Sequence, residues 1–252
     1  MAFDVAADLY DRFMGRYSTH LSAGLADLAG VQPRQRVLDV GCGPGVLTAE
    51  LVRRVGPEAV AAVDPSEPFV EAARARHPGV DVRLGAAEEL PHPDDAFDAA
   101  LAQLVVHFMT DPVGGIAEMA RVTRADGVVT ASVWDLAGDR APISAFWRAA
   151  RALDPDAQDE SRFAGARAGH LSELFAEAGL RDVEEVELPA PVEHASFEDW
   201  WEPFTFGVGP AGAYARSLGE GELSELRDRC RSLLPEAPFT LTAFAWAARG
   251  IV

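Results

Sequence analysis

Residues 39–45, Asp-Val-Gly-Cys-Gly-Pro-Gly, place three glycines within five positions directly after a short apolar run. Glycine lets the backbone turn sharply and approach a ligand closely, and the first N–H groups of a following helix lack partners within that helix. Asp64 ends the next apolar run, where a carboxylate can accept hydrogen bonds from both ribose hydroxyls of a nucleoside. Alone, the first feature is an ordinary turn and the second an ordinary helix cap. Together they indicate a nucleoside-type ligand.

The glycine spacing differs from that of dinucleotide-binding folds. Those folds use G-x-G-x-x-G, but here the last position is Val46 when counted from Gly41 and Thr48 when counted from Gly43. A nicotinamide or flavin dinucleotide is therefore disfavoured as the ligand.

The elements that must position the turn and the acid alternate along the first half of the chain. Apolar runs predict strands at 36–40, 59–63, 80–84, 97–102 and 128–134, and helical spacing predicts helices at 3–10, 20–29, 46–55, 66–76 and 113–123. Strands that alternate with helices of this length predict a parallel sheet covered on both faces.

The pattern changes after residue 134. Residues 136–168 and 189–235 are irregular, with a short helix near 143–153, while 171–178 predicts a helix and 183–188 and 239–247 alternate as strands. We expect one domain over residues 1–252, with cap helices in 1–30 and the two irregular stretches as insertions over a substrate. The aromatic stretch from Trp200 to Phe206 either lines the substrate pocket or forms the ordinary core of such an insertion.

Residues 37–45, Val-Leu-Asp-Val-Gly-Cys-Gly-Pro-Gly, resemble the first signature of the class I S-adenosylmethionine-dependent methyltransferases. Segments 64–66, 85–91, 97–112 and 121–127 resemble later motifs of the family and come in its order, so the resemblance covers about residues 8–135. It implies an α/β fold with a Rossmann-like, mostly parallel seven-stranded sheet, helices on both faces and an antiparallel last strand. It also implies S-adenosyl-L-methionine as the cofactor.

The same resemblance implies a set of cofactor-binding residues. They are Arg16, Tyr17, Asp39, Gly41, Cys42, Gly43, Asp64, Pro65, Ala87, Glu88 and Gln103. Arg16 and Tyr17 belong to a segment similar to one in small-molecule members, and they either fold over the methionine end of the cofactor or simply pack and cap a helix. Many relatives carry Asp where Ala86 stands, so the adenine contact passes here to Ala87 and Glu88 or their backbone.

Methyl transfer is an in-line displacement at a sulfonium, so the protein aligns the acceptor and, for a hydroxyl or thiol, removes its proton. His107, just past the fourth predicted strand, is the first candidate for the general base and His20 the second. A histidine in this place can equally pack beside the cofactor or hydrogen-bond the substrate. Residues 102–104, Ala-Gln-Leu, lack the Asp with which similar catechol-type enzymes bind magnesium, so we predict no metal.

The charge and composition of the chain disfavour some classes of binding partner. A net charge of −18, from 40 acidic and 22 basic residues, disfavours nucleic acid and anionic membranes. Two cysteines are too few for a disulfide scaffold, and the sequence has neither a basic, apolar leader nor an apolar stretch of about 18 residues. We therefore expect a cytoplasmic protein that acts on a small-molecule methyl acceptor, with its oligomeric state open.

Two other functions are compatible with parts of this pattern. A protein that binds S-adenosylmethionine without transferring its methyl group, in regulation or another reaction, would carry the same cofactor motifs. A nicotinamide dehydrogenase would instead bind NAD and have no affinity for S-adenosylhomocysteine, and the glycine spacing already weighs against it.

Overall fold

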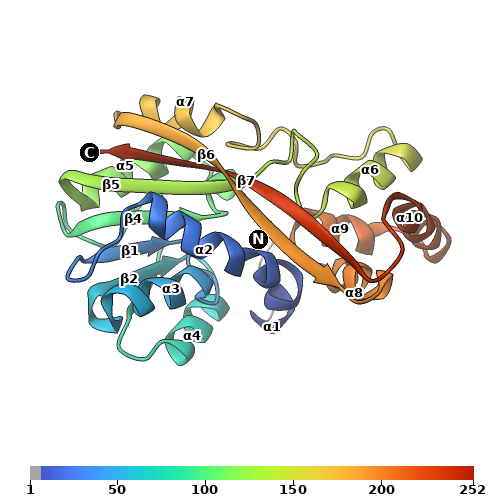
Figure 1. Cartoon of the computed structure of the whole chain (residues 1–252), viewed down its shortest axis with the longest axis horizontal. Helices are drawn as coiled ribbons and strands as arrows, with labels where there is room; N and C mark the ends of the chain where they lie inside the picture. Colours follow the sequence, from blue (N-terminus) through green and yellow to red (C-terminus); the bar gives the residue numbers. More distant parts are fainter. Residues whose placement is uncertain (1–6) are drawn as a thin grey trace.

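The computed structural model describes residues 7–252, which form one seven-stranded sheet in the order β3-β2-β1-β4-β5-β7-β6 (Figure 1). Its parallel strands are β1 (Val37–Val40), β2 (Val60–Asp64), β3 (Asp81–Leu84), β4 (Phe97–Gln103) and β5 (Thr123–Trp134). The strands β6 (Arg181–His194) and β7 (Phe239–Ile251) complete it, and β7 pairs antiparallel with both β5 and β6. The predicted fold class, including the antiparallel last strand, is confirmed.

Helices cover both faces of the sheet because each strand of its centre is apolar on both sides. One face carries α2 (Arg16–Leu28), α3 (Val46–Val55) and α4 (Glu67–Arg76), and the other carries α5 (Pro112–Val122) and α7 (His170–Glu177). Short 3-10 turns, η2 (Pro57–Ala59) and η3 (Val106–Phe108), lie in two of the connections. The chain reverses its direction of winding between the neighbours β1 and β4, where doubly wound sheets bind ligands beyond the carboxyl ends of the strands.

The N-terminal helix is longer than predicted. The helix α1 (Ala7–Tyr10) continues through a π-helical turn, η1 (Asp11–Gly15), into α2, whereas the sequence predicted separate helices at 3–10 and 20–29, of which residues 3–6 lie outside the described part. The hydroxyl groups of Ser18, Thr19 and Ser22 donate to carbonyl oxygens four residues earlier. These polar residues therefore remain within the helix instead of interrupting it.

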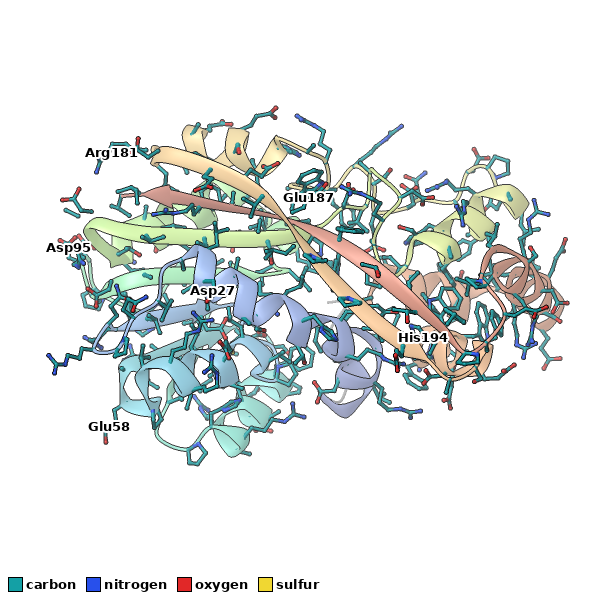
Figure 2. All side chains as sticks on the ribbon, viewed as in Figure 1. Asp27, Glu58, Asp95, Arg181, Glu187 and His194 are labelled. Atoms are coloured by element: carbon teal, nitrogen blue, oxygen red, sulfur yellow. The ribbon has the colours of Figure 1, made fainter. Side chains whose placement is uncertain are left out.

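The two last strands also exceed their predicted lengths. The pairing of β6 with β7 runs from Arg181 opposite Ile251 to His194 opposite Phe239, and Figure 2 labels Arg181 and His194 at the two ends of β6. Pro189 fits because β6 is an edge strand. Residues 189–194, which the sequence predicted to be irregular, are thus part of the sheet.

Five helical segments surround the far ends of β6 and β7, to the right in Figure 1, and we call them the outer helices. They are α6 (Ser144–Leu153), α8 (Phe197–Trp201), η4 (Glu202–Phe206), α9 (Gly209–Ser217) and α10 (Glu220–Leu233). Their core is aromatic, with the rings of Phe146 and Phe204 stacked at 4.7 Å and Trp200 also 4.7 Å from Phe204. The predicted irregular stretch at 189–235 is therefore mostly helical. Within residues 7–252 no helix is both long and apolar enough to cross a membrane.

Candidate functional site

A cleft of about 590 Å³ lies at the carboxyl edge of the parallel strands. This volume falls within the range of small-molecule and cofactor sites, about 300–1,000 Å³. The loops after β1, β2 and β4 form its walls, together with the N-terminal helix. The lining includes Tyr10, Gly41, Gly43, the run from Asp64 to Phe69, Gln103, Leu104, Val105 and Phe108.

The glycine turn after β1 brings main chain directly to the cleft. Gly41 has a φ of +69°, and a Cβ at this position would lie 2.4 Å from Cγ2 of Val105, so only glycine fits. Gly43 has a φ of +54°, and a Cβ there would meet nothing within 4 Å. The second glycine thus leaves open space that a ligand can occupy.

Asp64 faces the same space from the end of β2. Its Oδ2 accepts from the N–H of Gly43 at 2.8 Å, and its Oδ1 accepts from the N–H of Ser66, also at 2.8 Å. Burial raises the pKa of Asp64, and the two main-chain hydrogen bonds oppose that rise. Each oxygen retains acceptor capacity toward the cleft, which suits a pair of neighbouring hydroxyl groups.

Asp39 lines a small cavity of about 20 Å³, the inner extension of the cleft, which adjoins the cleft because Tyr10, Gly41, Gly43 and Gln103 line both. Its side chain is 1% exposed, its Oδ2 accepts from Oγ1 of Thr48 at 2.6 Å, and its Oδ1 is buried without a hydrogen-bond partner in the described structure. Burial raises the pKa of Asp39 to about 7, against the lowering effect of Thr48. A buried acceptor left unpaired is costly, so a ligand that donates a hydrogen bond here would be favoured.

Gln103 and Cys42 complete this inner end. The Gln103 amide donates to the carbonyl oxygen of Ser18 at 3.1 Å and its Oε1 accepts from Ser22 at 3.0 Å, which ties the end of β4 to α2. The Cys42 thiol, whose pKa burial raises, contacts the carbonyl oxygen of Gly43 at 3.4 Å. Both residues line the small inner extension of the cleft beside Asp39.

The two N-terminal residues predicted to cover the methionine end point elsewhere. The Arg16 guanidinium donates to Asp199 at 3.1 Å and to the carbonyl oxygen of Glu193 at 2.9 Å, toward the outer helices. The buried Tyr17 hydroxyl pairs with Nε2 of His194 at 2.8 Å. Neither residue lines the cleft, and their contacts favour the alternative in which they pack within the protein.

Tyr10 and Ser18 instead reach the inner end from this helix. A hydrogen bond joins the two side chains, and burial raises the pKa of Tyr10 to about 12. Tyr10, Met14 and Ser18 follow one another at intervals of four, which places them on one helix face. This spacing could have identified Tyr10 and Ser18 from the sequence, but only if the helix had been known to be continuous.

The two residues predicted to contact adenine, Ala87 and Glu88, lie outside the wall of the cleft. The Glu88 carboxylate accepts from the N–H groups of Thr110 at 2.7 Å and Asp111 at 3.3 Å, and Ala87 is buried in the core under α5. The wall of the cleft includes Pro65, a member of the predicted cofactor-binding set, and Phe69.

A smaller cavity of about 40 Å³ adjoins the cleft, because Tyr10, Leu104 and Phe108 line both. Its walls are mainly apolar and come from the N-terminal helix, the end of β5 and the outer helices. They include Phe13, Met14, Trp134, Leu136, Ile143 and the run from Val208 to Ala211. We call this space the side cavity.

His107 lines the side cavity, whereas His20 is exposed on α2 and lines neither space. Nδ1 of His107 is buried without a hydrogen-bond partner among residues 7–252. Burial lowers the pKa of His107 to about 3. The imidazole is therefore neutral and weakly basic, which disfavours the predicted general-base role and favours the alternative of a hydrogen bond to substrate.

Glu160 is a residue of the side cavity that sequence reasoning missed. The side chain is 4% exposed, and its Oε2 accepts from Nε1 of Trp147 at 2.7 Å. Burial raises the pKa of Glu160 to about 7, and the Trp147 hydrogen bond opposes this. In the sequence Glu160 is one acid within a polar, irregular stretch, so no local signal distinguishes it.

Residues 38–131 match the family described as Methyltransferase domain. The chain is 42% identical over 95 residues to 2-methyl-6-phytyl-1,4-hydroquinone methyltransferase 2 of Oryza sativa, covering 37% of this chain and 27% of that protein. It is 35% identical over 133 residues to nocamycin O-methyltransferase of Saccharothrix syringae, covering 50% of this chain and 48% of that protein. The chain thus spans about half or less of these curated relatives.

The fold of the chain is also similar to that of solved structures. The YcgJ protein from Bacillus subtilis matches with a TM-score of 0.60 at 21% identity, covering 92% of this chain and 98% of that one. At this identity the likeness supports the fold and leaves the acceptor open.

Proposed function

We propose that this chain, which belongs to the class I S-adenosylmethionine-dependent methyltransferases, transfers the cofactor's methyl group to a small, largely apolar molecule. The observation that carries the proposal is the cleft in which Gly43, Asp64 and Asp39 present open main chain, a carboxylate and an unpaired buried oxygen in succession. These groups match, in order, the parts of a nucleoside that carries an amino acid, as S-adenosylmethionine does.

The residues present fit the cofactor. Asp64 would hold the ribose hydroxyls, and Pro65 and Phe69 would pack against the base. The unpaired Oδ1 of Asp39 would accept from the ammonium of the methionine portion, with Tyr10 and the main chain beside Gln103 closing that end. When bound, S-adenosylmethionine supplies a methyl group on a positively charged sulfur, which departs readily as a neutral thioether.

The side cavity is the proposed acceptor site, and the outer helices are its lid. The cavity adjoins the cleft at Tyr10 and Leu104, and its apolar walls favour an apolar acceptor. Its volume of about 40 Å³ holds roughly three water-sized groups, so it receives the reactive end of the acceptor. His107 would position that end through its unpaired Nδ1.

Calorimetry of S-adenosylmethionine binding tests the cofactor site. We expect Asp64→Ala to weaken binding at least about tenfold, because it removes charge-assisted hydrogen bonds to the ribose. Glu58→Ala, which removes an exposed acid beside the start of β2, should bind like the wild type. Affinity that is unchanged in Asp64→Ala would refute the proposed site.

Methyl transfer itself needs a second assay. The purified protein is incubated with radiolabelled S-adenosylmethionine and a panel of small phenols, amines and thiols, and label in the organic phase is counted. Tight cofactor binding without transfer to any acceptor would favour the alternative, a protein that binds the cofactor for regulation or another reaction.

A further inference from the structure

Glu160 combines burial with the lack of a positively charged partner. It lies in the side cavity at 4% exposure, and its one hydrogen bond comes from the neutral indole of Trp147. No arginine forms an ion pair with it anywhere in residues 7–252, although its neighbour Asp159 pairs with Arg151. Burying a carboxyl group in an apolar cavity costs folding free energy. We therefore expect Glu160 to have a functional role in this cavity.

Trp147 holds this carboxyl group in a fixed place. The indole is 3% exposed in the core of the outer helices, with its ring 5.3 Å from that of Phe146 and 5.5 Å from that of Tyr214. Because the donor cannot move without disturbing this core, the carboxyl group is oriented before any ligand arrives. Preorganisation of this kind is what a catalytic group requires.

The other titratable groups around the side cavity stay neutral. Burial keeps the pKa of Tyr10 near 12 and that of His107 near 3, so neither changes its charge around neutral pH. Glu160 is the group of this cavity whose pKa, about 7, lies where proton transfer is efficient. Its carboxylate form is a considerably stronger base than an exposed glutamate.

We propose that Glu160 accepts the proton of the methyl acceptor, and that the acceptor is a hydroxyl compound of which a phenol is the simplest example. This inference rests on the proposed methyl transfer. A hydroxyl group needs a base before it attacks, whereas a cationic amine has no free electron pair and would be held in its protonated form by an ion pair with the carboxylate. His107, in the tautomer with a proton on Nδ1, would donate a hydrogen bond to the hydroxyl oxygen as negative charge develops on it.

The step balances without any further reagent. The O–H bond of the acceptor breaks and its proton moves to a carboxylate oxygen of Glu160. The oxygen forms a bond to the methyl carbon while the carbon–sulfur bond breaks, and that electron pair stays on sulfur. The products are a methyl ether, S-adenosylhomocysteine and a protonated Glu160, which then releases its proton to solvent.

A comparison of acceptors with and without a transferable proton tests the proposal. Glu160→Gln is compared with Asp156→Asn, which removes an exposed negative charge from the same segment. For phenols we expect kcat to fall about 100-fold or more in Glu160→Gln. For quinoline, whose nitrogen is methylated without loss of a proton, we expect less than about a threefold change. Equal losses for both acceptor types, or no loss for phenols, would overturn the assignment.

A second measurement does not depend on turnover. 4-Nitrophenol, whose visible absorbance reports its own ionisation, is bound to the complex with S-adenosylhomocysteine at neutral pH. Because a carboxylate disfavours a second negative charge beside it, the wild type and Asp156→Asn should both hold less of the bound phenol as phenolate than Glu160→Gln does. Identical spectra in wild type and Glu160→Gln would refute the role of Glu160. Absence of methyl transfer alongside the expected spectral difference would count against the proposed transfer and leave Glu160 as the group that faces the acceptor hydroxyl.

Discussion

Replacing Glu160 by glutamine should stabilise the protein at alkaline pH and leave its stability nearly unchanged at acidic pH. The carboxyl group has a pKa of about 7 in the folded chain against an ordinary value of 4.5, mainly because it is buried. As pH rises, the unfolded chain therefore loses this proton first. The free energy of unfolding of the wild type is therefore unaffected by this group below about pH 4.5. It then falls progressively up to about pH 7, by about 3 kcal/mol in total.

Glutamine does not ionise, and its amide oxygen can still accept from Trp147. Urea unfolding at about pH 4 and about pH 8 gives the free energy of unfolding of each variant. Because the cost of burying the glutamine amide does not depend on pH, it cancels when the two pH values are compared. The stability gain of Glu160→Gln should grow by about 3 kcal/mol between them, or roughly 6–12 °C in Tm. Asp156→Asn should show little growth. A gain that is the same at both pH values would refute the claim that burial raises the pKa of Glu160.

Three further substitutions test the cleft and the side cavity. Asp39→Asn should weaken binding of S-adenosylhomocysteine more than binding of adenosine in calorimetry, because in the proposed site the unpaired Oδ1 accepts from the ammonium of the amino-acid portion; equal losses would contradict this placement. Gly41→Ala should lower Tm, since its Cβ would lie 2.4 Å from Val105, whereas Gly43→Ala should retain most of its Tm and lose cofactor affinity. A Gly43→Ala variant that binds normally would show that the cofactor does not approach this turn. His107→Gln should raise the KM for the acceptor while kcat falls less than about threefold, and a much larger fall in kcat would return the proton-transfer role to His107.

The features that sequence reasoning located well depend on short stretches of chain. The glycine turn and Asp64 each follow an apolar run, and parallel pairing of β1 with β2 brings their ends together. The hydrogen bond from Gly43 to Asp64, at 2.8 Å, is the direct consequence. Alternation of strands and helices was enough to predict this meeting, because every strand of the parallel part ends at the same edge of the sheet.

Features that depend on docking between distant segments were not predictable. Which face of the N-terminal helix looks into the cleft depends on the outer helices, since Arg16 pairs with Asp199 and Arg12 with Glu202. These ion pairs lie on the helix face that contacts the outer helices, whereas Tyr10 lines the cleft. Likewise, the predicted irregular residues 189–194 form a strand because β7, some fifty residues later, pairs with them.

The relative basicity of His107 and Glu160 also depends on residues that are distant in the sequence. In water histidine is the stronger base of the two candidate residue types, so a sequence directs attention to His107. Within the side cavity the order is reversed, because burial lowers the pKa of His107 to about 3 and raises that of Glu160 to about 7. The apolar walls responsible come from the N-terminal helix, β5 and the outer helices. The identity of the proton acceptor is therefore a property of how these segments pack, and it follows that substitutions in the wall that admit water should move both pKa values back toward their ordinary order.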